Sequence, residues 1–167
     1  MAGDGSGGGE PMRLVRMQPG LAVFGRSVAT LMTKSDFAKA PFGHIARMLA
    51  GQVNRGHFAF VERGKATVGF VGWAFTTEEL AEAWVTGQRG VSDAEARGGD
   101  CVLLNAWAAD DPAVSAFIVT ALQDLLAGKR KIYAKRHYTD GRTRPLRLPI
   151  GRRTGAHAAA ALAAMQG

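Results

Sequence analysis

Residues 57–75 read HFAFVERGKATVGFVGWAF, and this stretch decides the fold because it predicts a β-hairpin. The segments His57–Val61 and Ala66–Phe75 are rich in aromatic and β-branched residues, which favour strands. The four residues between them include a glycine that can take the positive φ of a tight turn. Gly69 and Gly72 inside the second strand indicate a bulge, or a close approach by another backbone or a ligand.

Helical segments are predicted on both sides of this hairpin. Apolar residues at helical spacing mark three of them, and Thr76 followed by Glu79 forms a capping-box pattern that begins the fourth. A proline at position 41 and another at position 112 suit the first turns of two of these helices. The predicted helices cover residues 21–32, 41–53, 76–84 and 112–125.

Three further strands complete the predicted fold, at Cys101–Trp107, Lys131–Arg136 and Thr143–Leu148. The order of helices, hairpin, helix, strand, helix and hairpin predicts an α+β protein with a largely antiparallel sheet flanked by helices. A length of 167 residues fits one domain. We expect that domain at residues 21–150, after a flexible Gly-rich leader at 1–20 and before a basic, then Ala-rich, tail at 151–167.

The single cysteine, Cys101, excludes an intramolecular disulfide and fits a reducing compartment. Because it lies in an apolar run, a buried structural thiol is favoured over a nucleophile. No apolar run approaches the roughly 18 residues that a membrane span needs, and no basic segment followed by an apolar core marks a secretory signal. The sequence therefore predicts a cytoplasmic protein.

The net charge of +7 is concentrated at one end of the chain. Residues 129–153 contain ten Lys or Arg and one acid, so the remainder has eleven bases and thirteen acids. Such a patch attracts acidic partners: an acidic protein, an anionic membrane surface or a nucleic acid. A solvated basic surface is the alternative. The predicted partner-binding residues are Lys129, Arg130, Lys131, Lys135, Arg136, Arg142, Arg144 and Arg147.

Several segments together resemble a known family. The run 23–35, VFGRSVATLMTKS, is similar to that family's opening helix, and 57–63 (HFAFVER) and 68–74 (VGFVGWA) are similar to its first hairpin. Residues 104–109, LNAWAA, fall where the family has an Asp-containing strand, and the basic hairpin at 131–148 falls where it has its closing strands. The family is that of the RTX-toxin-activating lysine acyltransferases, and the resemblance covers residues 21–150.

This resemblance implies a GNAT-like fold and a cytoplasmic enzyme that moves a fatty acyl chain from acyl carrier protein to lysine side chains. Family catalysis depends on a His after the first helix and an Asp on the central strand. In this chain the His position falls on Phe37 or Ala38, and the Asp position falls on Asn105. Neither Phe nor Ala can accept the proton of an attacking amine. His44, seven residues after Phe37, is the fallback base.

Three functions follow from this pattern. The first is an accessory, non-catalytic relative that binds an acidic protein, such as acyl carrier protein or an enzyme that it assists. The second is an active acyltransferase with non-standard residues and an acyl carrier protein as co-substrate. The third, a nucleic-acid-binding module, is disfavoured because only Tyr133 and Tyr138 offer stacking surfaces in the basic segment. No cofactor and no metal site is expected, and a homodimer is left open.

Overall fold

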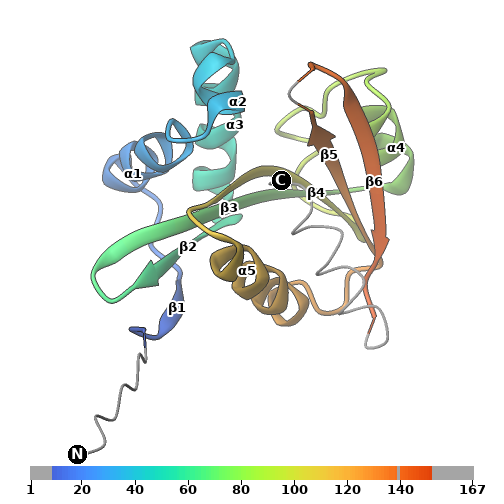
Figure 1. Ribbon diagram of the computed structural model, residues 1–167. Helices are drawn as coiled ribbons and strands as arrows, with labels where there is room; N and C mark the ends of the chain where they lie inside the picture. The colour runs from blue at the N-terminus through green and yellow to red at the C-terminus, as the bar shows by residue number, and fades with distance from the viewer. Residues whose placement is uncertain (1–8, 139, 152–167) are drawn as a thin grey trace, which may run out of the picture.

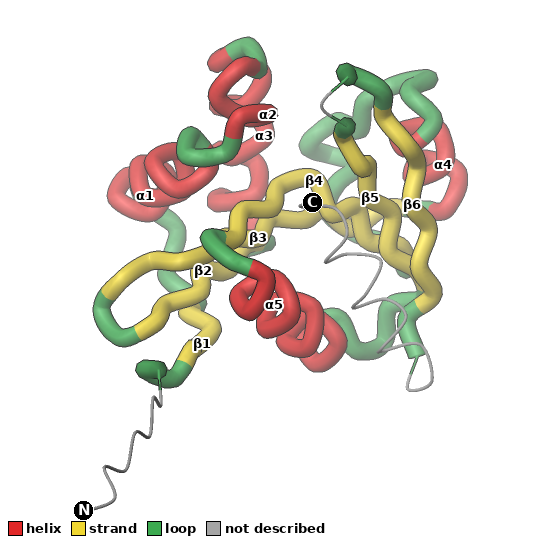
Figure 2. The backbone as a smooth tube through the Cα atoms, in the orientation of Figure 1, coloured by secondary structure: helices red, strands yellow, loops and turns green. Residues whose placement is uncertain are grey.

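A six-stranded sheet forms the centre of the protein in the computed structural model, which describes residues 9–138 and 140–151 (Figure 1). Figure 2 shows the helices gathered around this sheet. The elements are β1 (Met12–Val15), α1 (Leu21–Leu31), α2 (Ser35–Lys39), α3 (Phe42–Arg55), β2 (Phe58–Arg63), β3 (Ala66–Thr76), α4 (Glu78–Val85), β4 (Cys101–Ala109), α5 (Pro112–Leu125), β5 (Lys131–His137) and β6 (Thr143–Pro149).

The strands lie in the sheet in the order in which they occur in the chain. All neighbouring strands are antiparallel except β4 and β5, which run parallel across the helix α5 that connects them. The predicted α+β class with a largely antiparallel sheet is therefore confirmed. The parallel ladder is short: it joins Cys101–Leu104 to Lys131–Ala134 and then stops, although both strands continue.

Helices cover both faces of the sheet. Helix α5 packs against one face through a core that includes Val114, Ile118 and Leu122. On the opposite face, α1 and α3 cover the β2–β3 region through a second core, and α4 covers the start of β4 and β5 through a third. Figure 1 shows α1 to α3 on one side and α4 with β5 and β6 on the other, above the shared strands β3 and β4. Two groups of helices thus stand on one face, on either side of the place where β4 and β5 part.

Two elements were missed by the sequence analysis, and one cap was placed wrongly. Residues 12–15, inside the expected leader, form β1 along the edge of β2, and the short helix α2 precedes α3. The cap of α4 is Thr77, whose hydroxyl accepts from the backbone N–H of Leu80. The prediction of Thr76 as the cap was wrong, because Thr76 is fully buried and pairs with Cys101 as the last residue of β3. The predicted leader at 1–8 and tail at 152–167 lie outside the described residues.

Both glycines inside β3 allow a close approach, as predicted. An added Cβ at Gly69 would lie 2.9 Å from Val114 of α5, and one at Gly72 would lie 2.1 Å from Gln52 Oε1 of α3. The register between β3 and β4 also shifts beside Gly72, so that this glycine marks a bulge as well as a contact. A side chain at either position would push a helix away from the sheet.

Candidate functional site

A large cleft lies between the two groups of helices, where β4 and β5 part. Its volume is about 1170 Å³, and its walls come from α2 and α3 on one side and from α4, the following loop and the end of β5 on the other. The β4–β5 ladder ends at Leu104 and Ala134, and the next residue of each strand, Asn105 and Lys135, lines the cleft. The arrangement is an open groove that reaches down to the central strand.

Asn105 lies at the base of this cleft because β4 bulges there. Gly72 pairs with Ala106 and Trp73 pairs with Leu104, so Asn105 is the extra residue of the bulge and has no partner on β3. The bulge interrupts the alternation of the strand and turns Asn105 and Ala106 toward the same face. Asn105, the residue expected at the family's Asp position, is thereby aimed into the cleft.

The side chain of Asn105 is held by Gln52. Gln52 Nε2 donates to Asn105 Oδ1 over 2.5 Å, and Gln52 itself is fully buried. Its other amide atom, Oε1, is buried without a hydrogen-bond partner among the described residues and lies over Gly72. Sequence reasoning missed Gln52, although a glutamine in the same helical stripe as Ile45 and Leu49 was the signal that could have found it.

The positions expected to carry the family's histidine lie in α2. Phe37 lines the cleft and packs on the core beneath α1 and α3, whereas Ala38 is exposed. The structure therefore brings Phe37 and Asn105, far apart in sequence, into one groove. Phe37 presents a phenyl ring to this groove, and Asn105 presents an amide that is hydrogen-bonded within the protein.

Two of the four histidines line the cleft. His44 is exposed in the first turn of α3, on the same wall as Phe37, and His137 lies at the end of β5 on the other wall. His57 is not part of the lining: its ring is stacked on Trp73 and tilted against Phe75. Burial, helped by nearby Arg55 and Arg16, lowers the pKa of His57 to about 4. His157 lies outside the described residues.

The loop after α4 ties the two walls together at one end of the cleft. Asp93 in this loop forms an ion pair with Arg55 at the end of α3 and another with Arg97. Arg89 pairs with Glu95 within the same loop. The arginines of this part of the lining are therefore neutralised. Within residues 9–138 and 140–151, the cleft cations that form no ion pair are Lys39, Arg47 and Lys135.

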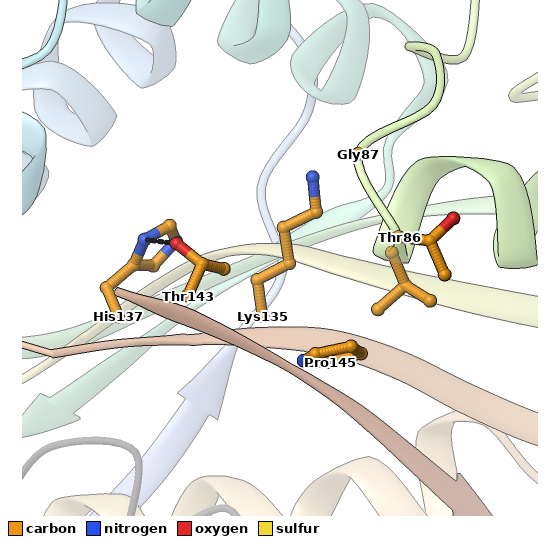
Figure 3. A pocket seen from close by; sticks show the side chains of 7 residues that line it. Thr86, Gly87, Lys135, His137, Thr143 and Pro145 are labelled. Carbon is orange, nitrogen blue, oxygen red and sulfur yellow. Dashed lines mark hydrogen bonds between the residues drawn. The ribbon is translucent and has the colours of Figure 1, made fainter. Parts of the chain in front are cut away.

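A smaller cavity of about 290 Å³ adjoins the cleft between α4 and the β5–β6 pair. Figure 3 shows Lys135 standing between His137 and the Thr86–Gly87 turn that follows α4. His137 Nδ1 lies 3.3 Å from Thr143 Oγ1. Lys135 and His137 line both cavities, so β5 provides the boundary between the two spaces.

The residues predicted to bind an acidic partner have diverse surroundings. Arg130 and Lys131 pair with Glu78, whose pKa falls to about 2, first because Lys131 and Arg130 donate hydrogen bonds to it. Arg147 donates to both carboxylate oxygens of Glu82. Arg142 pairs with Asp140. Among the described residues, four of the eight remain without an ion pair: Lys129, Lys135, Arg136 and Arg144.

Cys101 has the buried environment that the sequence predicted for a structural thiol. It is fully buried on β4, and desolvation raises its pKa. Within the described part of the chain, no group of three or more His, Cys, Asp and Glu side chains could hold a metal ion. Over the same residues, every helix is too short or too polar to cross a bilayer.

Comparison with known proteins places this geometry in a family. A model of the RTX toxin acyltransferase family (HlyC) matches residues 17–146, which is most of the chain. The chain belongs to this family, as the resemblance of its helix and hairpin segments predicted. No protein of curated function matches the chain.

Two solved structures resemble the fold at low sequence identity. The loading GNATL domain of CurA from Lyngbya majuscula is 15% identical over 77% of this chain and 66% of that chain, with a TM-score of 0.46. A protein from Staphylococcus aureus MU50, described as a candidate acetyltransferase, is 11% identical over 74% of this chain and 78% of that chain, with a TM-score of 0.42.

Proposed function

We propose that this protein binds an acyl thioester, presented by an acidic carrier protein, in the cleft between α3 and α4 without efficient transfer to lysines of other proteins. It would act in the cytoplasm as an accessory member of an acyltransferase family. The observation that supports this most directly is the Gln52–Asn105 hydrogen bond at the base of the cleft. This bond supports the proposal because it engages, inside the protein, the amide of the residue that the family resemblance aligns with a catalytic carboxylate.

The chemistry of lysine acylation explains why an amide in place of a carboxylate would matter. A lysine amine is mostly protonated at neutral pH and cannot attack a thioester until a base removes its proton. Phe37 has no proton acceptor, and the amide of Asn105 carries no charge to orient an imidazole or hold an ammonium group. Of the two carboxylates that line the cleft, Asp93 is bound by two arginines and Asp36 is exposed on α2.

The unpaired cations support an acidic partner. Lys39, Arg47 and Lys135 line the cleft, while Arg136 and Arg144 belong to the neighbouring β5–β6 pair. Charges that already serve internal ion pairs, such as Arg147, contribute less to a new contact because a partner must compete with Glu82. The expected docking surface is therefore the side of the cleft around β5, rather than the whole basic segment.

His44 supports a second candidate, an active acyltransferase with a displaced base. It lines the same cleft as Phe37 and Asn105 and stands one short loop after α2. A well-positioned substrate can lower a barrier substantially with only modest assistance from a base. In that case the carrier would enter the same groove, and the amine would approach from the α3 wall.

The test uses the full chain, an acyl carrier protein loaded with a long-chain acyl thioester, and a lysine-containing acceptor peptide. Binding is measured with a non-transferable thioether analogue on the carrier, and transfer is followed by intact mass. We expect a salt-sensitive complex and no acylation of the peptide above the rate without protein. Peptide acylation that is lost in His44→Ala and retained in His137→Ala would overturn the accessory function in favour of the second candidate.

A gain-of-function variant sharpens the test. Asn105→Asp combined with Ala38→His or Phe37→His restores the residue types that the family requires. If the cleft otherwise binds its substrate correctly, transfer to the peptide should rise roughly tenfold or more, since a positioned base contributes about 10²–10⁴-fold. The single variant Asn105→Asp is the matched control and should remain near the background rate. No rise in a folded double variant would count against this cleft as the thioester site.

A further inference from the structure

Lys135 stands at the point where β4 and β5 part. Ala134 is the last residue of β5 that pairs with β4, and Leu104 is its partner. Asn105 and Lys135 are therefore the first residues on the two sides of the opening, and both line the cleft. A molecule that entered the groove as far as the central strand would meet the Asn105 amide on one side and the Lys135 amine on the other.

The surroundings of the Lys135 amine are apolar on one side and lack a counter-ion. Its Nζ lies 4.4 Å from the centre of the Trp84 ring of α4. The carboxylates that α4 turns toward β5 are already engaged, Glu78 by Arg130 and Lys131, and Glu82 by Arg147 of β6. Of the two carboxylates that line the cleft, Asp93 is paired with Arg55 and Arg97, and Asp36 is exposed on α2. The other titratable or charged side chains of the lining are Lys39, His44, Arg47, Arg55, Arg89, Arg97, His137 and Tyr138. Among the described residues, no carboxylate forms an ion pair with Lys135.

We propose that Lys135 is an internal acyl acceptor, which takes the acyl chain from a thioester bound in the cleft and keeps it as an amide. This inference rests on the proposed function, because the thioester must first bind in the groove. It concerns a covalent modification of the protein itself, and it does not require transfer to another protein.

The chemistry balances without a further reactant. The neutral amine of Lys135 attacks the carbonyl carbon of the thioester, a C–N bond forms and the C–S bond breaks. The carrier thiolate leaves with the electron pair of that bond and takes the proton that the amine nitrogen loses. The products are an Nε-acyl lysine and the free thiol of the carrier. Partial burial lowers the pKa of Lys135, which increases the fraction of neutral amine at a given pH.

The lining of the cleft suits a retained acyl chain. Apolar side chains on both walls line the cleft that Lys135 enters, among them Ile45, Met48, Trp84, Val91 and Leu103. An amide is far more resistant to hydrolysis than a thioester, and the residues that would be needed to pass the chain onward are absent from the Phe37 and Asn105 positions. Each molecule would therefore accept one chain and then stop.

The experiment uses the full chain with the palmitoyl thioester of an acyl carrier protein as donor. Intact mass reports the addition of one acyl chain, peptide mapping locates it, and treatment with hydroxylamine distinguishes an amide from a thioester. Lys135→Arg keeps the charge and can stack on Trp84, and Lys39→Arg is the matched control in the same cleft. We expect modification of the natural chain and of Lys39→Arg at position 135, and a loss of roughly tenfold or more in Lys135→Arg.

Three outcomes would overturn the inference, and they differ in what they say about the proposed function. Binding of the carrier analogue by the natural chain without any acylation would remove the internal acceptor and leave the accessory function standing. If the natural chain does not bind the carrier analogue, both the internal acceptor and the accessory function are wrong. Acylation that persists in Lys135→Arg would assign the acceptor to another residue. As a control, a circular dichroism spectrum of Lys135→Arg like that of the natural chain excludes misfolding as the reason for a loss of acylation.

Discussion

The two halves of β4 have opposite roles. Cys101–Leu104 pairs with β3 on one side and β5 on the other, and all four residues are buried. Asn105–Ala109 keeps β3 as a neighbour but has lost β5, and it begins with the bulge that turns Asn105 into the cleft. One continuous strand therefore supplies the framework of the fold and the base of its candidate site.

This contrast separates the part of β4 that holds the sheet together from the part that lines the candidate site. The paired half leaves no space for substitution, because backbone ladders and buried side chains fix it on both sides. In the unpaired half, the side chain of Asn105 lines the cleft and accepts a hydrogen bond from Gln52 in the cleft wall. Four changes test whether the two halves differ in this way.

The largest effect is expected at Gly99, just before the paired half. Its φ is 138°, and an added Cβ would lie 2.1 Å from the backbone oxygen of Thr76, the residue that pairs with Cys101. Because neither backbone can yield easily, Gly99→Ala should lower the free energy of unfolding by roughly 3 kcal/mol. Urea denaturation measures this. Gly98→Ala, with open space around its Cβ, should stay within about 0.5 kcal/mol of the natural chain, and equal losses would contradict the steric argument.

The next effect is expected at Gly72, opposite the bulge. An added Cβ would lie 2.1 Å from Gln52 Oε1, so Gly72→Ala should displace Gln52 from Asn105 and cost about 1–3 kcal/mol. Gln52→Ala should also destabilise the protein, because Asn105 loses its hydrogen-bond donor. In a double-mutant cycle by urea denaturation, the two losses should be less than additive. Simple additivity would show that the Gly72–Gln52 contact is not the cause.

A pH-dependent effect is expected at His57, whose backbone carbonyl accepts a hydrogen bond from Trp73 beside the register shift of β3. Its pKa is about 4 in the folded protein against 6.5 ordinarily, so the unfolded chain binds the proton more readily. The contribution of neutral His57 to the free energy of unfolding is fully present above about pH 6.5 and is lost as the pH falls through about 4. Because the ring is only half-buried, we expect the free energy of unfolding to fall by on the order of 1–2 kcal/mol over this pH range. Urea denaturation at several pH values should show a flatter profile for His57→Asn than for His44→Asn. Equal slopes would contradict this origin.

The smallest effect is expected on the β6 side of the paired half. Arg147→Gln removes a bidentate hydrogen bond to Glu82 and should lower the free energy of unfolding by about 0.2–1 kcal/mol. Thermal denaturation should show this as a small fall in the unfolding midpoint. Arg144→Gln removes a cation that forms no ion pair with the described residues, and it should leave stability unchanged while weakening carrier binding. The reverse pattern would mean that Arg147 is the residue that a partner recognises.

Much of the framework could be predicted because local patterns and tertiary structure agree there. The hairpin at residues 57–75, the helix that begins at Asp111 and Pro112, and the apolar start of β4 follow from alternation, helical spacing and capping. The edge strand at Met12–Val15 could not be predicted, since four residues without a clear alternation become a strand only by pairing with β2.

The site was predictable only in part. Asn105 and Phe37 were singled out from the family resemblance, but their common cleft depends on the bulge and on how α2 stands over the sheet. The basic segment looked like one patch in the sequence, because its ion-pair partners Glu78 and Glu82 lie some fifty to sixty residues earlier. Lys135 was predicted as a partner contact, and only the end of the β4–β5 ladder shows it at the opening.

The parting of β4 and β5 also determines which strand edges another chain could pair with. An unpaired strand edge is a template for pairing with other chains and so promotes aggregation. Here the unpaired edge of β4 faces inward, with β5 and β6 standing beyond it, instead of forming the outer border of the sheet. A whole sheet from another molecule would meet β6 first. A partner for the backbone groups of residues 105–109 on this edge would therefore have to be narrow enough to enter between β4 and β5.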